Sequence, residues 1–224
     1  MKNWVLRSLV VAGMLFATSS AHALPLRSPQ VPFNGGPLQA YLNVVDSGIN
    51  VAANQLDAQV WSVGITGNTD FTLMLKTPIA QGNAVGVYNG PAVGAPPLFQ
   101  VFPPGAVPGW YAALHFAGGN LTVTMFDQNS LIMGQNFYPG VNPNSFGFYT
   151  LGPCGLWYSQ DYRNPNPQVL SYASNNLLGD YWVCFEECQY NPASTFDGVV
   201  INIQSVRPTD ATNSTWGKVK GLYR

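Results

Sequence analysis

Charged side chains are scarce in this chain: Asp, Glu, Lys and Arg make up 8% of its 224 residues, against roughly 25% in an ordinary soluble domain. The nine bases and ten acids leave no basic surface of the kind that nucleic-acid binders need, so no nucleic-acid partner is predicted. The polar positions are taken by 20 Asn and 12 Gln residues instead. With 6 Trp, 11 Tyr and 12 Phe, the chain is too apolar to be disordered, and it lacks the periodicity of a helical bundle.

The usual catalytic motifs are missing as well. The sequence contains no G-x-S-x-G elbow, no H-E-x-x-H, no G-x-x-x-x-G-K-[ST] and no G-x-G-x-x-G that opens a helix. His115 lies in an apolar run, where we expect it to be packed or at a sheet edge. A glycosidase needs two converging carboxylates, whereas Glu186 and Glu187 are neighbours that point to opposite faces of a strand. The sequence therefore predicts a protein that is not an enzyme, and a secreted hydrolase that uses carboxylates from distant strands is the last alternative.

The first 23 residues have the pattern of an export leader. Lys2 and Arg7 form a basic region before an apolar stretch at 9–17, and an A-x-A cleavage site stands at 21–23. We expect cleavage after Ala23, with an uncleaved anchor as the alternative. No later stretch approaches the ~20 apolar residues of a spanning helix. The prediction is a secreted protein, extracellular, at the cell surface or in the periplasm, with no membrane span after cleavage.

Charge is distributed unevenly once the leader is set aside. Between residues 28 and 206, two bases oppose nine acids, which gives a net charge of −7. The last 18 residues carry four bases and one acid, a net charge of +3. An acidic body suits cations and argues against anionic polymers as partners.

Three cysteines, Cys154, Cys184 and Cys188, remain in an oxidising compartment and can form at most one disulfide bond. In an extended strand the Cα atoms of Cys184 and Cys188 are about 13 Å apart, so these two can bond only if the chain turns between them. A bond from Cys154 to either of the others closes a loop of about 30 residues and stabilises by about 3–4 kcal/mol. We expect Cys154 to be bonded, with its partner left open. Three thiolates without a nearby fourth ligand do not make a zinc site.

Short β-rich runs divided by turn residues dominate the chain from residue 38. Runs of four to eight residues at this spacing predict one all-β domain over 38–206, an antiparallel β-sandwich that is jelly-roll-like. Residues 24–37 are predicted to be an extended lead-in, and 207–224 a linker with a basic tail that is either frayed or a short amphipathic docking segment. The predicted strands are 59–65, 71–75, 84–88, 98–102, 110–116, 121–126, 131–137, 146–151, 155–158, 169–172, 180–186 and 198–206.

Two of these strands share a short pattern. Residues 85–88 and 146–149 both read apolar-Gly-apolar-Tyr. One interpretation is a chance match in a chain rich in Gly and Tyr. The other is a pair of equivalent strands, one in each sheet.

The stretch 179–203 carries the strongest hint of a binding site, because it reads as strand, polar connection, strand. Glu186, Glu187 and Asp197 lie at the two ends of the connection, with Asn, Ser and Thr between them. Clustered oxygen ligands are what Ca²⁺ takes. The alternative is an acidic hairpin tip surrounded by water.

The run 185–187, Phe-Glu-Glu, followed by 196–200, Phe-Asp-Gly-Val-Val, resembles the terminal hairpin of a bacterial family of exported domains of unknown function. The family pattern is F-E-D, an Asp/Gly-rich loop and [FY]-N-D-V-V-F, and many members carry a Pro-Glu-Pro sorting tag. The resemblance extends over about residues 38–206 through similar runs at 50–55, 71–75, 83–88 and 146–149.

This resemblance implies a secreted, non-enzymatic β-sandwich with a calcium site at Glu186, Glu187 and Asp197. The chain departs from the family pattern in two respects. Its 191–195 segment replaces the Asp-rich centre, so we expect any Ca²⁺ binding to be weak, and it has no sorting tag.

Carbohydrate binding is the second function that the residues indicate. Secreted sandwiches present Trp and Tyr faces to sugar rings, with Asn and Gln near the hydroxyl groups. Trp157, Tyr158 and Trp182 form the candidate glycan platform, with burial in the core as the alternative. We therefore expect an exported binding or structural module stabilised by weakly bound calcium, whose partner is an extracellular polysaccharide or a surface protein, and a carbohydrate-binding module is the runner-up.

Overall fold

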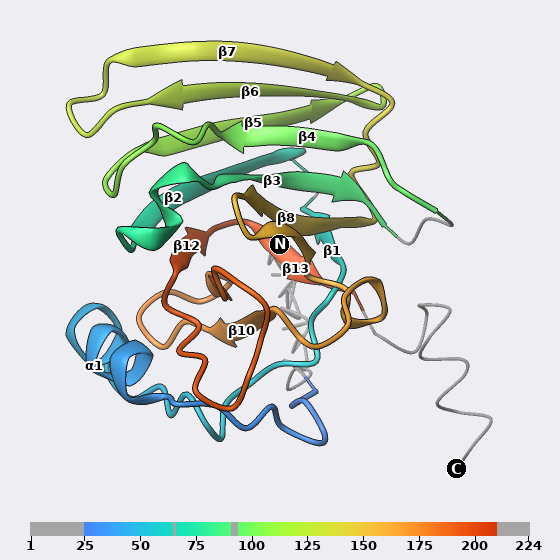
Figure 1. The fold of residues 1–224 in the computed structure, drawn as a ribbon. Coiled ribbons are helices and arrows are strands. Elements are labelled where there is room, and N and C mark those ends of the chain that lie inside the picture. The colour runs from blue at the N-terminus through green and yellow to red at the C-terminus, as the bar shows by residue number, and fades with distance from the viewer. Residues whose placement is uncertain (1–24, 65, 91–93, 210–224) are drawn as a thin grey trace, which may run out of the picture.

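The computed structural model describes residues 25–64, 66–90 and 94–209. Two antiparallel sheets pack face to face (Figure 1), which confirms the predicted all-β sandwich. The predicted leader at 1–23 and the end of the basic tail at 210–224 lie outside the described residues. Each of the twelve predicted strands coincides with one of β1 to β12, because the alternation of apolar residues and the turn residues between them are local signals.

The six-stranded sheet is ordered β13-β1-β8-β3-β4, with β9 paired to β8. Its strands are β1 (Trp61–Val63), β3 (Ala84–Asn89), β4 (Leu98–Phe102), β8 (Phe146–Gly152), β9 (Gly155–Tyr158) and β13 (Val206–Pro208).

The seven-stranded sheet runs from β10 at one end to β7 at the other. In spatial order its strands are β10 (Val169–Ala173), β11 (Tyr181–Phe185), β12 (Val199–Ile203), β2 (Asn68–Lys76), β5 (Tyr111–Ala117), β6 (Asn120–Phe126) and β7 (Ile132–Pro139). Two short 3-10 helices, η1 (Ile79–Gly82) and η2 (Asp161–Arg163), lie in the connections.

The main core fills the space between the sheets and combines aliphatic side chains with a group of aromatic rings. Trp61, Phe71 and Phe148 are fully buried. The Phe148 ring lies 5.6 Å from Trp61 and 5.5 Å from Phe71, centroid to centroid. Such tilted and edge-on pairs stabilise by about 0.5–1.5 kcal/mol beyond the area they bury.

The shared apolar-Gly-apolar-Tyr pattern belongs to β3 and β8, which are neighbours in one sheet and not equivalent strands of two sheets. Gly86 stands opposite Tyr149, and Tyr88 stands opposite Gly147. A Cβ atom at Gly147 would collide with the Tyr88 ring, and one at Gly86 with the Tyr149 ring and the Phe99 carbonyl oxygen. Each glycine therefore makes room for the tyrosine of the other strand.

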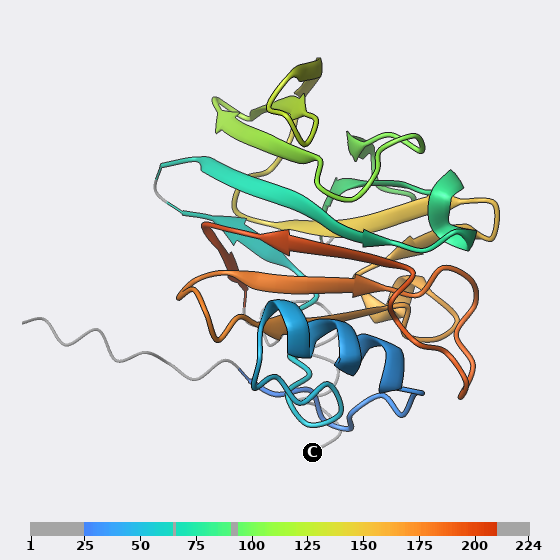
Figure 2. The same ribbon diagram turned by 90° about the vertical axis from the view of Figure 1, so that its left-hand side faces the viewer.

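A third layer, which the sequence analysis does not predict, covers part of the seven-stranded sheet. Helix α1 (Gly36–Val45) lies across the outer face of β10, β11 and β12 (Figure 2). Pro37 stands in its first turn, where the missing N–H costs nothing. Leu38 and Leu42 are one turn apart and fully buried, so the helix is held by a single apolar stripe.

The segment before α1 is fastened to the same part of the molecule. Leu26 forms a bridge with Leu56, and the Gln55 side chain exchanges hydrogen bonds with the Val31 backbone (2.8 and 3.0 Å). The Leu56 amide in turn donates to the Ser171 carbonyl oxygen on β10 (2.9 Å). The outer edge of β10 is therefore bordered by other parts of the chain.

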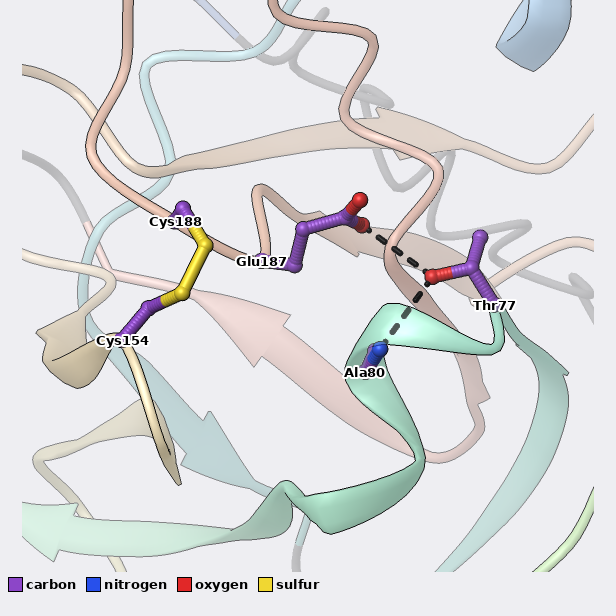
Figure 3. The surroundings of a disulfide bond; sticks show 5 residues. All are labelled: Thr77, Ala80, Cys154, Glu187 and Cys188. Carbon is purple, nitrogen blue, oxygen red and sulfur yellow. Dashed lines mark hydrogen bonds between the residues drawn. A yellow bond between two sulfur atoms is a disulfide. The ribbon is translucent and has the colours of Figure 1, made fainter.

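One disulfide bond, Cys154–Cys188, joins the β8–β9 turn to the segment that follows β11 (Figure 3). The prediction that Cys154 is bonded is confirmed, and the open choice of partner falls on Cys188. Cys184 is a free thiol, fully buried beneath α1, and burial raises its pKa. The bond connects the two sheets at the end where β11 and β8 lie.

Candidate functional site

The acidic hairpin lies between β11 and β12, and its first carboxylate turns into the loop itself. Glu186 is 7% exposed, and its Oε2 atom accepts hydrogen bonds from the backbone N–H groups of Thr195 (3.0 Å) and Phe196 (3.1 Å). Burial raises the pKa of Glu186, while these backbone donors oppose the rise and the charge of Asp197 adds to it. Glu186 therefore holds the loop in shape.

The second carboxylate points elsewhere. Glu187 accepts a hydrogen bond from the Thr77 hydroxyl (3.2 Å), and Thr77 Oγ1 also accepts one from the Ala80 amide (3.4 Å; Figure 3). The Glu187 side chain lies over Gly198, where a Cβ atom would collide with it. Burial raises the pKa of Glu187, as do the charges of Glu186 and Asp197. The residue thus ties the hairpin to the start of η1.

The three predicted calcium ligands are close in space without facing one another. Their charges interact, yet Glu186 binds the loop backbone and Glu187 binds Thr77. Within residues 25–64, 66–90 and 94–209, no group of three or more His, Cys, Asp or Glu residues is arranged to hold a metal ion. Glu186, Glu187 and Asp197 do not form a converged ligand set in this structure.

The residues of the predicted glycan platform do not form a single surface, and the prediction that Trp182 is exposed is wrong. Trp182 is 4% exposed, and its neighbour on β11, Tyr181, is 8% exposed. Tyr181 packs between the sheets and Trp182 packs under α1. The indole Nε1–H of Trp182 donates to the buried carboxylate of Asp46 (2.7 Å). Alternation places one of the two outside the sandwich, but the helix covers that side.

Trp157 and Tyr158 lie on β9, in the other sheet. The Tyr158 ring makes an edge-on contact with Tyr88 (5.0 Å between centroids), and the Arg163 guanidinium lies 5.5 Å from the centroid of each of these rings. Trp157 is half-buried. The Tyr158 ring is therefore occupied by structural contacts, and the Trp157 ring lies against Gly155 with its Nε1 atom buried.

The buried carboxylate of Asp46 was not singled out from the sequence. It is 1% exposed and accepts hydrogen bonds from Trp182, from the Ser174 hydroxyl (2.7 Å) and from the Asn175 amide (3.1 Å). Asp46 follows the last residue of α1, so it joins the helix to β11 and to the β10–β11 turn. Its role is structural, since each of its partners belongs to the fold.

An open surface lies on the seven-stranded sheet away from α1, and it too was not singled out as a site. We call it the bare face: the outward side chains of β5, β6 and β7. Register places them in three rows across the strands: Tyr111, Phe126 and Ile132; Ala113, Thr124 and Gln135; His115, Thr122 and Phe137.

The bare face combines aromatic rings with neutral polar groups. The Tyr111 and Phe126 rings stack at 4.6 Å with planes 8° apart, and Phe137 is 64% exposed. The Gln135 amide donates to the Thr124 hydroxyl (2.9 Å). His115 is also exposed and shares a hydrogen bond with Asn68 on β2 (2.6 Å). The alternation in 121–126 was the available signal, since it puts Thr122, Thr124 and Phe126 on one side.

A shallow pocket of about 280 Å³ forms beside the N-terminal segment. Arg27, Asp57, Asp161 and Tyr190 contribute to its walls, and Arg27 and Asp161 form an ion pair. Its volume falls slightly below the range of about 300–1,000 Å³ that is typical of small-molecule sites, so the bare face is the stronger candidate surface.

Comparison with protein-family models, curated proteins and solved structures gives no match to this chain. Within residues 25–64, 66–90 and 94–209, no helix has the length and apolar content needed to cross a bilayer.

Proposed function

We propose that this chain is an exported, non-catalytic binding or structural module that acts at the cell surface or outside the cell. The Cys154–Cys188 bond supports export, because disulfides persist in oxidising compartments. The leader pattern at 1–23 and the resemblance of the 185–200 hairpin to exported bacterial domains support the same location.

The observation that carries a binding role is the bare face. The same sheet has a covered half under α1 and an open half at β5, β6 and β7. The open half exposes Phe137 and Ile132, at 64% and 67%, beside half-buried aromatic rings. Large apolar side chains gathered on one open surface mark sites of interaction.

The chemistry of the bare face favours a neutral polysaccharide as the ligand, which is the carbohydrate-binding alternative. Aromatic rings bind the apolar C–H faces of sugars, and amide and hydroxyl groups bind their hydroxyls. Phe137 offers an exposed ring, and Gln135 with Thr124 offers an amide and a hydroxyl in the next row. Strands β5, β6 and β7 contain no Asp, Glu, Lys or Arg, so the bare face itself has no such charge, although the exposed Asp70 on β2 borders it opposite Ala113.

The test is retention of the protein on a panel of soluble and insoluble polysaccharides. Phe137→Ala should lower the affinity at least about tenfold, as expected for an exposed aromatic anchor. Trp157→Ala is the matched control, since it removes an aromatic ring on β9, in the other sheet. Loss of binding in Trp157→Ala alone would move the glycan site to β9. If the protein is retained on none of the polysaccharides, the glycan proposal fails and a surface protein is left as the class of partner.

Calcium is not needed for this proposal. Glu186, Glu187 and Asp197 do not present a converged ligand set, so weak calcium binding at the hairpin stays a separate prediction. The three carboxylates of the hairpin lie in a part of the chain, residues 28–206, that has more acids than bases. This excess of negative charge supports the prediction of calcium binding.

A further inference from the structure

Strand β7, at the open end of the seven-stranded sheet, exposes several apolar side chains, as does the residue just before it. Leu131, Ile132, Met133 and Phe137 are 63%, 67%, 49% and 64% exposed. Phe137 lies on the bare face, whereas on the inner face Tyr138 packs against the core and donates to the Gln100 carbonyl oxygen (3.0 Å). Among the described residues, β6 is the one strand paired with β7, and the other edge of β7 has no strand partner.

An open edge is a template for another strand, because its outward N–H and C=O groups lack protein partners. Proteins usually protect such edges with charged residues, prolines or bulges. Strand β7 has no charged residue, its proline is its last residue, Pro139, and the irregularity in its pairing leaves Met133 as an extra residue near its start. The segment from Gly134 to Tyr138 is therefore unprotected.

The geometry points to a second copy of this chain as the partner of β7, paired antiparallel about a two-fold axis. The strand complements itself when reversed: with Gln135 opposite Gln135 of the second copy, Phe137 faces the Ile132–Met133 bulge and Gly134 faces Asn136. Phe137 then meets apolar side chains, the two Gln135 amides meet each other, and Asn136 meets a glycine that leaves it room. A two-fold interface requires this self-complementarity, whereas a foreign strand does not.

Charge also selects this edge for self-association. The described residues carry four bases and nine acids, a net charge of −5, so two copies repel each other over most of their surface. Strands β5, β6 and β7 contain no Asp, Glu, Lys or Arg. The acid in the β6–β7 turn, Asp127, accepts hydrogen bonds from the Asn129 and Leu131 amides of its own turn (2.8 and 2.9 Å).

Pairing of this kind makes one continuous sheet from two copies. A two-fold axis perpendicular to the sheet keeps both bare faces on the same side, so the open surface doubles in width. The interface consists of one eight-residue strand from each copy, which is small compared with stable dimers, so the association is weak and depends on concentration. This inference does not require the ligand proposed for the bare face.

The test places charge on the two-fold axis. Gln135→Glu and Gln135→Lys each put like charges opposite each other in a homodimer, and each should weaken self-association at least about tenfold. An equimolar mixture of the two variants should restore it, because opposite charges then meet. Gln189→Glu, an exposed position on the β11–β12 connection, is the matched control for added charge. Sedimentation velocity over a concentration series measures all four proteins and the mixture.

The expected result is a wild type that dimerises with rising concentration, two variants that do not, and a mixture that does. A wild type that stays monomeric up to about 1 mM would overturn the inference. So would a dimer that Gln135→Glu leaves intact, since the interface would then lie elsewhere. A chain cut after Thr209 is a further sample. If this cut abolishes the dimer, and the mixture of Gln135→Glu and Gln135→Lys does not restore it in the full chain, the C-terminal tail occupies the edge and the inference is overturned too.

Discussion

At one end of the seven-stranded sheet, α1 and the N-terminal segment cover β10, β11 and β12, whereas at the other end β5, β6 and β7 meet solvent on their outer face. The outward residues account for the difference. Strand β11 places Trp182 and Cys184 outward, while β6 places Thr122 and Thr124 there. An apolar run such as 181–185 is typical of a strand buried on both faces, and an alternating run such as 121–126 of a strand buried on one. The outward positions decide whether a sheet face becomes a core or a surface.

The sharpest way to break the covered end is to remove a side chain from α1. Leu42 is fully buried under the helix, so Leu42→Ala should lower the free energy of unfolding by about 3–5 kcal/mol. Val44, on the same helix, is 85% exposed, and Val44→Ala should change it by less than about 0.5 kcal/mol. Urea denaturation measures both. Equal effects would mean that α1 does not contribute a core.

The disulfide bond ties the two sheets near the covered end, so its removal should have the next largest effect. It closes a separation of 34 residues, and replacing Cys154 and Cys188 by Ser together should cost about 3–4 kcal/mol. The measurement is chemical denaturation under oxidising conditions. The double variant and the wild type should become alike when reductant is added. A difference that persists in reductant would come from local packing and not from the bond.

The third prediction concerns calcium binding by the hairpin between β11 and β12. If the ion binds at the 10⁻⁴–10⁻³ M typical of extracellular modules, a tenfold excess over Kd should stabilise the wild type by about 1.4 kcal/mol. Thermal unfolding in EDTA and in Ca²⁺ measures this shift, with Mg²⁺ as competitor. Asp197→Asn should shrink it. An equal shift in both proteins, or no shift at all, would leave Glu186, Glu187 and Asp197 as parts of the loop.

A smaller effect should appear in the pH dependence of stability. Burial and neighbouring charges raise the pKa of Glu187 above its usual 4.5. The Glu187 carboxyl therefore binds a proton more readily in the folded state than in the unfolded chain. Above the raised pKa, ionised Glu187 lowers the free energy of unfolding. This penalty disappears as the pH falls through the raised pKa toward 4.5. Glu187→Gln should therefore be at least as stable as wild type at neutral pH. The gap between the two should narrow in acid, and a gap that widens would contradict the assignment.

The smallest expected effect on stability comes from a substitution on the bare face. Phe137 is 64% exposed, so Phe137→Thr should change the free energy of unfolding by less than about 0.5 kcal/mol. The same variant removes the aromatic ring proposed to bind ligand, which separates stability from function. Urea denaturation at low protein concentration is the measurement. A loss as large as that of Leu42→Ala would place Phe137 in a core.

The strands were predictable because their signals are local. Alternation and turn residues identify β1 to β12 without knowledge of what they pack against. Helix α1 was missed because the Pro and Gly residues at 25–37 read as an extended segment, although Pro37 followed by Leu38 and Leu42 at helical spacing is a usable signal. Strand β13, three residues long, is too short for any periodicity.

The site was less predictable than the fold, because its residues depend on coverage and direction. The composition of 181–185 shows aromatic residues, but it does not say that a distant helix covers Trp182. The spacing of Glu186, Glu187 and Asp197 brings three acids together, yet their hydrogen bonds to Thr195, Phe196 and Thr77 turn the first two apart. Such partners come from other parts of the chain and leave no trace in a local pattern.

The sequence separation between α1 and the strands that it covers, β10, β11 and β12, also bears on the order of folding. Strands β5, β6 and β7 follow one another along the chain, so their hairpins close short loops and can form early. The covered end unites α1 with strands far along the chain; the Trp182–Asp46 bond alone spans 136 residues. A ten-residue helix is marginal by itself, so α1 gains its stability only once β10, β11 and β12 exist. Among the described residues α1 is the first helix along the chain, and we expect it to be among the last elements to reach its native place.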